Sequence, residues 1–326
     1  MDEPINIAKQ QGESLDQLGD LAAFAESPVF SALLKGSACQ RSSELERCVE
    51  ALGLRHHIEG DLLRLTTPPT ELDITWLRGQ LGAGAKIHYD RVVDSTNRIA
   101  MEGSLTGTSC FIAEFQLGGR GRSGRKWISP YGDNLALSVT MVVDCSVASL
   151  SGFSLAIGFG MVEAFRAQKV EDIYLKWPND VLLSGKKTAG ILIEVDPVTA
   201  HRTKVVVGVG VNIGSFPPVD VIGQQATRIG LASTLSRETI ALAAIRAIER
   251  SAKRFVLQGL SPIVERWREV DAYQSQEVDL LIGEDRVSGT NVGINHAGHL
   301  LIETTSGLEE FSMGDVSLRP SAGESE

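Results

Sequence analysis

The sequence predicts an α+β protein made of three consecutive regions. A small helical region with a strand ribbon is expected over residues 1–80, a central region of strands and helices over 81–272, and a small β-barrel over 273–326. Three observations predict this organisation. The chain of 326 residues is long enough for two or three domains. Helical periodicity and β-branched runs both occur in the centre, and short strand-like segments separated by glycine turns fill the tail.

The first region carries one helix signal and one strand signal. Ser42 is placed to cap a helix whose first turn holds Glu44 and Glu46. Residues 61–65 alternate enough for a short strand, and Pro68 then breaks the chain. A full second helix is not evident. The region holds seven basic and thirteen acidic residues, a balance of −6, which suits DNA binding poorly because cations must neutralise the phosphates.

The central region supplies the main strands and helices. Four apolar residues between 155 and 165 fall on one helical face, and residues 238–258 form an Ala-rich second helix. Residues 190–195 and 204–211 are apolar, β-branched runs that we expect to form adjacent buried strands, the second of which could pair across the subunits of a homodimer. Further strands are expected at 87–93, 109–115 and 134–143, and in the tail at 277–282, 286–294, 299–303 and 308–312.

Composition narrows the class of protein. The chain is 43% hydrophobic and 22% charged, which is ordinary for a globular protein, and its net charge of −10 disfavours a general nucleic-acid binder. No apolar run approaches the roughly 18 residues that a membrane helix needs, and the acidic N-terminus does not resemble a secretory signal. The four scattered cysteines fit reduced thiols in a cytoplasmic protein.

Residues 118–126 are the most unusual segment of the chain. They hold four glycines and four cations in the order Gly118-Gly-Arg-Gly-Arg-Ser-Gly-Arg-Lys126. Glycine lets a backbone approach a ligand closely, and arginine offers several fixed donors to carboxylate and phosphate. This composition favours a mobile loop that closes on a small anion, over a solvated linker or an RNA-binding tract. The G-K-[ST] ending of a Walker A motif is absent.

A second cluster follows at Lys176-Trp-Pro-Asn-Asp180. Pro178 rigidifies a turn that presents Asn179 and Asp180 at a fixed place, and Lys187 follows beyond a hairpin-like turn. A lysine and an aspartate held close would suit acyl activation. Spacing alone leaves open a surface hairpin with a solvated lysine, and Trp177 is expected to be a core aromatic.

Taken together, these clusters resemble the biotin protein ligases. Residues 119–127 resemble that family's G-R-G-R-x-G-R-x-W loop, and residues 176–180 followed by Lys187-x-Ala-Gly190 resemble its second signature. Residues 94–97 (Asp-Ser-Thr-Asn) and 208–212 (Gly-Val-Gly-Val-Asn) are similar to two more family motifs, in the family's order. The resemblance covers roughly residues 85–320. It implies a catalytic domain like that of class II synthetases with a central mixed or antiparallel sheet, a winged-helix-like N-terminal domain and an SH3-like C-terminal barrel.

The resemblance also implies a two-step reaction. Biotin and ATP with Mg²⁺ give biotinyl-5′-AMP, and a lysine of the biotin carboxyl carrier protein then takes the biotinyl group. No protein ligand for a metal is assigned. The expected biotin-binding residues are Ser95, Thr96, Asn97, Gln116, Gly119, Arg120, Arg122, Lys187 and Gly190.

Nucleotide and catalytic roles follow from the same resemblance. Arg122 would hold the biotin carboxylate and later the adenylate phosphate, and Lys187 would stabilise charge in both steps. Trp127 would pack on the adenine, Asn212 would hydrogen-bond to it, and Arg319 would reach the nucleotide from the barrel. Asp180 would position or help deprotonate the acceptor lysine.

The N-terminal region departs from the family members that also repress transcription. Its acidity predicts a degenerate winged helix without operator binding. The same acidity argues against two alternatives, a bifunctional ligase and repressor and a non-enzymatic biotin-responsive regulator. The other rivals are a lipoate or octanoate ligase of the same fold, against which the arginine-glycine loop argues, and a phosphate-binding RNA protein.

Overall fold

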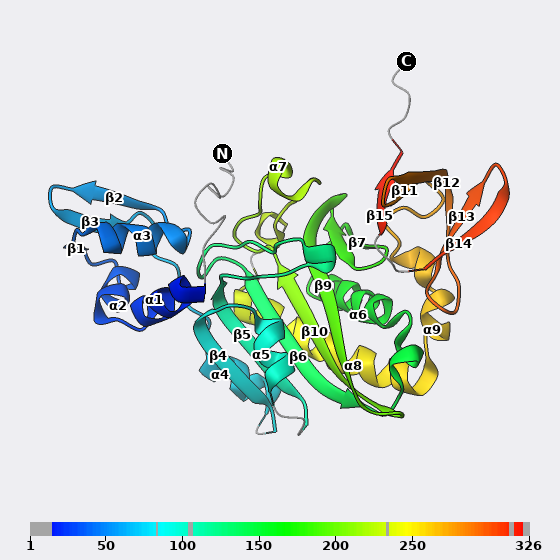
Figure 1. Cartoon of the computed structure of the whole chain (residues 1–326), viewed down its shortest axis with the longest axis horizontal. Helices are drawn as coiled ribbons and strands as arrows, with labels where there is room; N and C mark the ends of the chain where they lie inside the picture. Colours follow the sequence, from blue (N-terminus) through cyan, green and yellow to red (C-terminus); the bar gives the residue numbers. More distant parts are fainter. Residues whose placement is uncertain (1–14, 83, 104–106, 233–234, 313–315, 322–326) are drawn as a thin grey trace, which may run out of the picture.

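The computed structural model describes residues 15–82, 84–103, 107–232, 235–312 and 316–321. Three sheets organise these residues: a three-stranded sheet near the N-terminus, a seven-stranded central sheet and a five-stranded C-terminal sheet. Figure 1 shows the N-terminal and C-terminal units at opposite ends of the central sheet. The α+β class predicted from the sequence is therefore confirmed.

The central sheet is mixed and has the strand order β4-β5-β6-β10-β9-β8-β7. Only the β4–β5 pair is parallel among its described neighbours, and the other pairs are antiparallel. The predicted strands are all present. The sheet consists of β4 (Lys86–Val93), β5 (Ser109–Gln116), β6 (Leu135–Val143), β7 (Ile173–Lys176), β8 (Asp180–Leu183), β9 (Lys186–Thr199) and β10 (Arg202–Val211).

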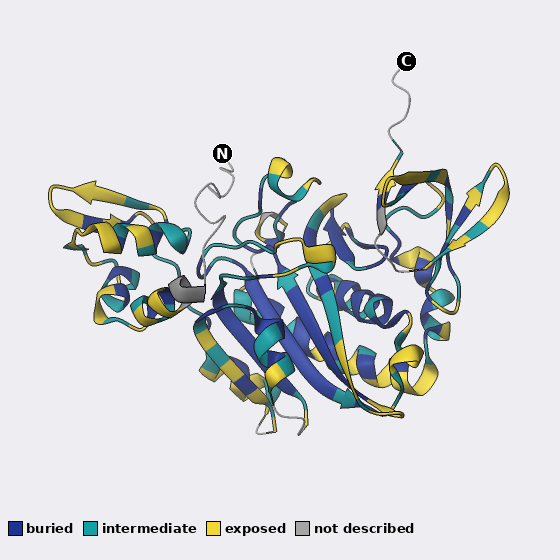
Figure 2. Ribbon diagram, in the orientation of Figure 1, coloured by how far each residue is buried: buried dark blue, intermediate teal, exposed yellow. Residues whose placement is uncertain are grey.

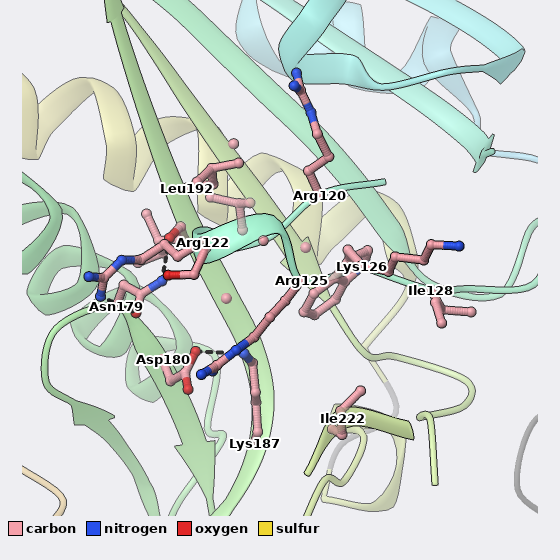
Figure 3. A pocket seen from close by; sticks show the side chains of 18 of the residues that line it. Arg120, Arg122, Arg125, Lys126, Ile128, Asn179, Asp180, Lys187, Leu192 and Ile222 are labelled. Atoms are coloured by element: carbon pink, nitrogen blue, oxygen red, sulfur yellow. Dashed lines mark hydrogen bonds and ion pairs between the residues drawn. The ribbon is translucent and has the colours of Figure 1, made fainter. Parts of the chain in front are cut away.

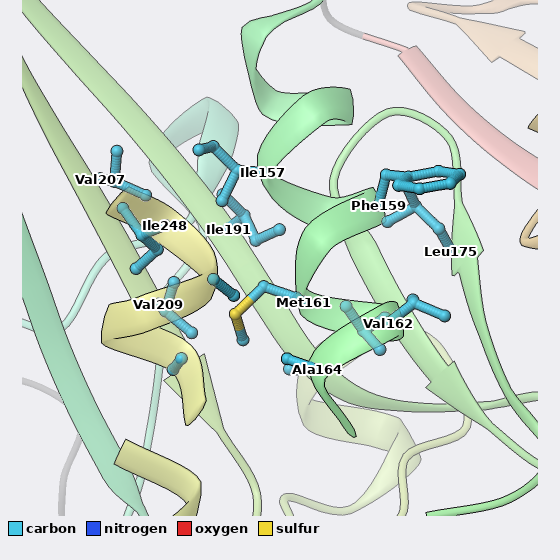
Figure 4. Close-up of a cluster of buried hydrophobic side chains, with 14 of the residues drawn as sticks. Ile157, Phe159, Met161, Val162, Ala164, Leu175, Ile191, Val207, Val209 and Ile248 are labelled. Atoms are coloured by element: carbon cyan, nitrogen blue, oxygen red, sulfur yellow. The ribbon is translucent and has the colours of Figure 1, made fainter. Parts of the chain in front are cut away.

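Two long helices cover one face of this sheet. The predicted helices appear as α6 (Phe153–Ala167) and α8 (Arg237–Gln258), and their apolar side chains interlock with those of β9 and β10 (Figure 4). The segment 147–167 is long and apolar enough to cross a membrane, contrary to the expectation that no stretch is. It is the core helix α6 with the turn η2 (Val147–Leu150) before it, and a helix apolar on most sides is typical of burial between two layers.

The opposite face of the sheet is left open for a site. Odd-numbered residues of β10, such as Val207 and Val209, point into the core beneath α6 and α8. The even positions include Val206, which packs under α5 (Thr96–Glu102), and then Gly208 and Gly210. Successive side chains of a strand point to opposite faces of the sheet. Gly208 and Gly210 have no side chain to fill the face that carries α5, so this face is open just beyond the helix.

The N-terminal unit contains two helices before Ser42, so the expectation that a second helix is missing was wrong. The helices are α1 (Leu15–Ala25), α2 (Pro28–Leu34) and α3 (Ser43–Ala51), and the strands are β1 (Cys39–Gln40), β2 (His56–Glu59) and β3 (Leu62–Leu65). Ser42 caps α3 as predicted, accepting a hydrogen bond from Leu45 N at 3.1 Å. The hydrophobic core of this unit also takes in Val92, Phe115 and Tyr131 of the central region.

The C-terminal unit is an antiparallel sheet of order β14-β13-β12-β11-β15. Four of its strands were predicted, and the fifth, at the end of the chain, was not. They are β11 (Glu277–Ile282), β12 (Asp285–Ile294), β13 (Leu300–Thr304), β14 (Gly307–Phe311) and β15 (Val316–Pro320). The short connecting helices of the chain are α4 (Ile74–Leu81), α7 (Val219–Ile222), α9 (Ser261–Val264), η1 (Arg122–Gly124), η3 (Ile229–Leu231) and η4 (Trp267–Glu269). Figure 2 shows burial concentrated in the central sheet and exposure on the outer hairpins.

Pairing of residues 205–211 with a strand of another subunit, a possibility that the sequence left open, is not available to β10. Strand β10 pairs with β6 on one side and with β9 on the other along its whole length. Both rows of backbone hydrogen-bonding groups are therefore used within the sheet, and none is left for a strand of another subunit.

Candidate active site

A pocket of about 390 Å³ opens on the uncovered face of the central sheet. Its floor is formed by β9 and β10, and its walls come from the start of α5, the loop after β5, the β7–β8 turn and the segment around α7. A volume of this size lies within the usual range for small-molecule sites. The four motifs singled out in the sequence, together with the segment around α7 that none of them covers, thus meet at one cavity. Figure 3 shows the cationic loop, the β7–β8 turn and Ile222 around it.

One end of the pocket is formed by a network of hydrogen-bonded side chains at the start of α5. Thr96 donates through its backbone N–H and its hydroxyl to the Gln116 side-chain oxygen, at 2.8 and 3.0 Å. Asn97 donates to Glu194 at 2.7 Å and accepts from Ser138 at 2.6 Å. Gly208 permits this arrangement, because a Cβ there would lie within 2.9 Å of three Asn97 side-chain atoms. The result is a preorganised polar slot of neutral groups beside one carboxylate.

Helix α5 is held from its other end by a buried lysine. The ammonium of Lys204 donates to the backbone oxygens of Met101 and Gly103, at 2.5 and 2.7 Å. A cation at a helix C-terminus satisfies carbonyls that have no partner within the helix and complements the helix dipole. Lys204 therefore helps to fix the position of Ser95, Thr96 and Asn97 at the opposite end.

The cationic loop folds as a tight irregular hairpin. Trp127 N donates to Gly119 O at 2.9 Å, and Gly121 N donates to Arg125 O at 2.7 Å. Ser123 and Gly124 at its tip both have positive φ, of 53° and 71°. A non-glycine residue in that region is uncommon, so Ser123 marks the strained point of the turn.

The cations of this loop point in different directions (Figure 3). Arg122 reaches the Asn179 side-chain oxygen at 3.4 Å, and Arg120 lies 3.7 Å from Glu194 in the α5 slot. The guanidinium of Arg125 extends toward Asp180, whereas Lys126 turns away. The loop thus places Arg120 at the α5 end of the pocket, and Arg122 and Arg125 on the side of Asn179 and Asp180.

Trp127 lies on the two floor strands. Gly190 and Gly210 are directly paired across β9 and β10, and a Cβ on Gly210 would lie within 2.7 Å of three indole atoms. Among the described residues, the buried indole nitrogen of Trp127 and the side-chain oxygen of Asn212 have no hydrogen-bond partner. Buried polar atoms normally have one, and three other described atoms, in Asn134, Thr188 and Ser215, also lack it. Trp127 and Asn212 line the pocket, so their two atoms are available to hydrogen-bond a ligand there.

The opposite end of the pocket holds a buried carboxylate between two lysines. Asp180 contacts Lys187 at 2.7 Å and Lys176 at 3.0 Å. Burial opposes ionisation of Asp180, but Lys187 and Lys176 outweigh that effect and hold the pKa of the carboxyl well below its usual range. Burial also lowers the pKa of Lys176, although Asp180 opposes this. At neutral pH Asp180 is therefore a poor proton acceptor and a good partner for cations.

The structure brings together nearly all residues singled out from the sequence. Trp177 is fully buried, as expected, and its indole donates to Gly298 O at 3.0 Å. Gly119 does not line the pocket; its carbonyl accepts the hydrogen bond from Trp127 N that closes the loop. Arg319 lies elsewhere: it is exposed on β15 opposite Asp279, and the neighbouring Leu318 lines the pocket instead. The remaining predicted residues that line the pocket are Ser95, Thr96, Asn97, Gln116, Arg120, Arg122, Trp127, Asp180, Lys187, Gly190 and Asn212.

Sequence reasoning gave no role to several polar residues of the site. Arg125 and Lys176 lie inside the quoted motifs, so their motif membership was an available signal. Ser138 and Glu194 lie in apolar strands, and Gln224 lies in a segment without periodicity. In the parts of the chain that the structure describes, no three His, Cys, Asp or Glu residues lie close enough to hold a metal ion.

Comparison with known proteins agrees with this geometry. Residues 89–212 match the biotin/lipoate A/B protein ligase family, and residues 276–319 match the biotin protein ligase C-terminal domain. The bifunctional ligase/repressor BirA of Escherichia coli is 34% identical over 266 residues, covering 80% of this chain and 83% of that protein. The biotin–[acetyl-CoA-carboxylase] ligase of Mycobacterium tuberculosis is also 34% identical, over 76% of this chain and 96% of that protein.

A solved structure shows the same fold. The biotin protein ligase of Aquifex aeolicus in complex with biotin and ATP superposes with a TM-score of 0.63 at 28% identity, covering 72% of this chain and 99% of that chain. Family models, relatives and structure all agree with the resemblance seen in the motifs. The chain therefore belongs to the biotin protein ligase family.

Proposed function

We propose that this protein activates biotin with ATP as biotinyl-5′-AMP and transfers the biotinyl group to a lysine of a biotin carboxyl carrier protein. The observation that carries the proposal is the convergence of Arg122, Arg125 and Lys187 with the buried Asp180 over one pocket that also holds two orphaned polar atoms. The relatives named as biotin–[acetyl-CoA-carboxylase] ligases support the same activity and acceptor.

Biotin would occupy the slot at α5. Its ureido group is a neutral donor and acceptor, which matches the amide and hydroxyl groups of Thr96, Asn97 and Gln116. An apolar slot with a few convergent hydrogen bonds discriminates well against analogues that lack those groups, because the site's polar atoms would then be left unpaired. The slot at α5 therefore favours biotin over lipoate, which has no ureido group.

ATP would occupy the centre and the end near α7. Adenine would stack on Trp127, and its amino group would donate to the orphaned oxygen of Asn212. Mg²⁺ would enter with ATP as part of the substrate. Arg319 has no part in this proposal, because it lies outside the pocket.

In the first step, a carboxylate oxygen of biotin attacks the α-phosphorus of ATP, the bond to the β-phosphate breaks, and pyrophosphate leaves. The two reactants are both anions, so their repulsion must be cancelled where they meet. Arg122 and Lys187 are preorganised to do this, and fixed charge in a site shielded from water is usually the largest catalytic effect. Closure of the loop of residues 118–126 would keep water from the adenylate.

In the second step, the amine of the acceptor lysine attacks the carbonyl carbon of the adenylate, the carbon–oxygen bond to phosphate breaks, and AMP leaves while the amine's proton passes to solvent. Because Lys187 and Lys176 hold the pKa of Asp180 low, we assign Asp180 the role of orienting the amine by accepting a hydrogen bond. Of the two roles expected from the resemblance, positioning the acceptor lysine or helping to deprotonate it, we therefore propose the first.

One assay tests the proposal. The protein is incubated with ATP, Mg²⁺, labelled biotin or labelled lipoate, and a carrier domain, and covalent label on the carrier lysine is measured. Biotin label that depends on ATP is the expected result. Lipoate label, or no label with biotin, would overturn the proposal.

We further propose that the N-terminal unit does not bind an operator. Its helix α3 carries Glu44, Glu46 and Glu50, and Arg41 beside it is paired with Glu46. A gel shift with the biotin operon promoter, in the presence of biotin and ATP, should show no specific complex at physiological salt. The free thiols described in the structure fit a cytoplasmic location. Any homodimer must use a surface other than β10.

A further inference from the structure

The segment of residues 214–228, which we call the strap, closes the end of the pocket near α7. Its backbone is fixed beside Lys187, whose N–H donates to Gln225 O at 3.0 Å and whose carbonyl accepts from Thr227 N at 2.8 Å. Apolar residues of the strap, including Val221 and Ile222, line the cavity. The strap therefore contacts the pocket through two kinds of side chain, apolar ones over the cavity and one amide at its edge.

That amide belongs to Gln224. Gly223, with a φ of +67°, ends α7 and turns the chain so that Gln224 reaches inward. Its side-chain oxygen accepts a hydrogen bond from Lys176 Nζ at 2.8 Å, and its side-chain nitrogen lies 3.5 Å from an Asp180 oxygen. Gln224 thus bridges two residues that are themselves an ion pair, at 3.0 Å.

We propose that Gln224 is a positioning residue: it holds the Lys176 ammonium on one oxygen of Asp180, so that the other oxygen and Lys187 keep the geometry needed for transfer of the acyl group to the acceptor amine. This inference rests on the proposed function. It adds a residue from outside the recognised motifs, and it links the strap that covers the nucleotide end to the carboxylate at the transfer end.

The surroundings of Lys176 explain why a neutral acceptor is needed. Only 9% of its side chain is exposed. The groups that face it are Asp180 of β8, Lys187 of β9 and Arg125 of the cationic loop, so that two of the three charged neighbours repel it. An ammonium buried in this way needs hydrogen-bond acceptors, and the amide oxygen of Gln224 supplies one without adding charge.

Without that oxygen the Lys176 ammonium is less stable. Its proton is then lost at lower pH, and the pairing of Asp180 shifts toward Lys187. Gln224→Met removes the acceptor at nearly constant volume, whereas Gln224→Glu keeps an oxygen in reach and adds a charge that favours the ammonium. The exposed neighbour Gln225 provides the matched control, Gln225→Met, because its contacts to Lys187 are made by the backbone.

The test separates the two steps. Pyrophosphate release is measured with biotin and MgATP alone, and transfer is measured in single turnovers from preformed biotinyl-5′-AMP to a carrier domain. We expect Gln224→Met to slow transfer at least about tenfold, which is the loss expected for one hydrogen bond to a charged group. Pyrophosphate release should fall less, the alkaline limb of the transfer rate should move to lower pH, and Gln224→Glu should move that limb back. Gln225→Met should match the wild type.

A second measurement, of the Lys176 side chain itself, requires no enzymatic turnover and therefore tests this inference independently of the proposed function. The pKa of the Lys176 ammonium is followed by NMR in lysine-labelled protein. It should fall in Gln224→Met and rise in Gln224→Glu relative to the wild type. An unchanged Lys176 pKa, or transfer equal to that of the wild type in a folded Gln224→Met variant, overturns the inference. A wild type that releases no pyrophosphate with biotin overturns the proposed function instead.

Discussion

Replacing Gly210 with alanine would place a methyl group where the indole of Trp127 now lies. An ideal Cβ on Gly210 would be within 2.7 Å of three ring atoms, whereas ordinary van der Waals contact begins near 3.4 Å. The ring must therefore retreat by about 1 Å, and a misplacement of that size at a reacting site can lower the rate about a hundredfold. We expect kcat/KM for ATP to fall by about that factor.

The facing strand supplies a matched control. Gly190 is paired with Gly210, but a Cβ on Gly190 would lie 3.4 Å from the nearest indole atom, which is an ordinary contact. Gly190→Ala should therefore lower kcat/KM by less than about tenfold, since the added methyl group fits without displacing the ring. Both variants introduce the same methyl group into the same floor, and only the position of the indole distinguishes them.

The assay is biotin-dependent pyrophosphate release at varied ATP, with urea unfolding alongside. Gly210→Ala should cost about 1–3 kcal/mol of stability at most, because overpacking is relieved when the ring moves into the cavity. Wild-type kcat/KM for ATP in Gly210→Ala, or an equal loss in Gly190→Ala, would refute the placement of Trp127 at the nucleotide.

Three further outcomes are expected. Lys187→Met or Arg122→Met should each slow adenylate formation by about 10²–10³-fold, which is the usual effect of losing one donor to a developing charge. The urea midpoint of unfolding should change much less. A loss of activity that is explained by a matching loss of folded protein would indicate a structural role instead. Asn212→Leu should raise the KM for ATP about tenfold or more with little change in the KM for biotin, because it removes the orphaned oxygen; a selective rise in the KM for biotin would contradict the assignment. The folded pKa of Asp180 lies below its unfolded value, so its contribution to stability is present above the unfolded pKa of about 3.9 and is lost as the pH falls through the folded pKa. The free energy of unfolding of Asp180→Asn should therefore be lower than that of the wild type by about 3–5 kcal/mol from pH 8 to 5, with the gap shrinking below pH 4, as urea titrations at each pH can show.

The motifs predicted the site well because each of them is contiguous in sequence. Residues 94–97, 118–127, 176–180 and 208–212 each place several functional groups within one turn or strand end, so their composition is visible without a structure. The glycines at 208 and 210 permit close approach, and the side chains that approach are those of Asn97 and Trp127.

The residues that were missed depend on pairing between distant segments. Glu194 reaches Asn97 only because β9 lies beside β10 in one register, and Gln224 reaches Lys176 across 48 positions. Arg319 lies outside the pocket for a related reason, because β15, which the sequence pattern did not reveal, decides which of its residues face inward.

The N-terminal helices were missed for a different reason. Helix α2 has only seven residues, too few for a periodic pattern, although Ser27 and Pro28 form a readable cap at its start. Helix α1 is interrupted in sequence by Gly19 and acquires much of its stability from packing against the central region. Short elements of this kind depend on tertiary contacts more than on local pattern.

The central claim is that the cations of residues 118–126, together with Lys187, close on an activated acyl phosphate. A crystal structure with a non-hydrolysable biotinyl-adenylate analogue tests it most directly. The account predicts Arg122 and Lys187 within hydrogen-bonding distance of the acyl and phosphate oxygens, with the indole of Trp127 against the adenine. Arginines of the loop directed into bulk solvent, away from the bound analogue, would contradict it.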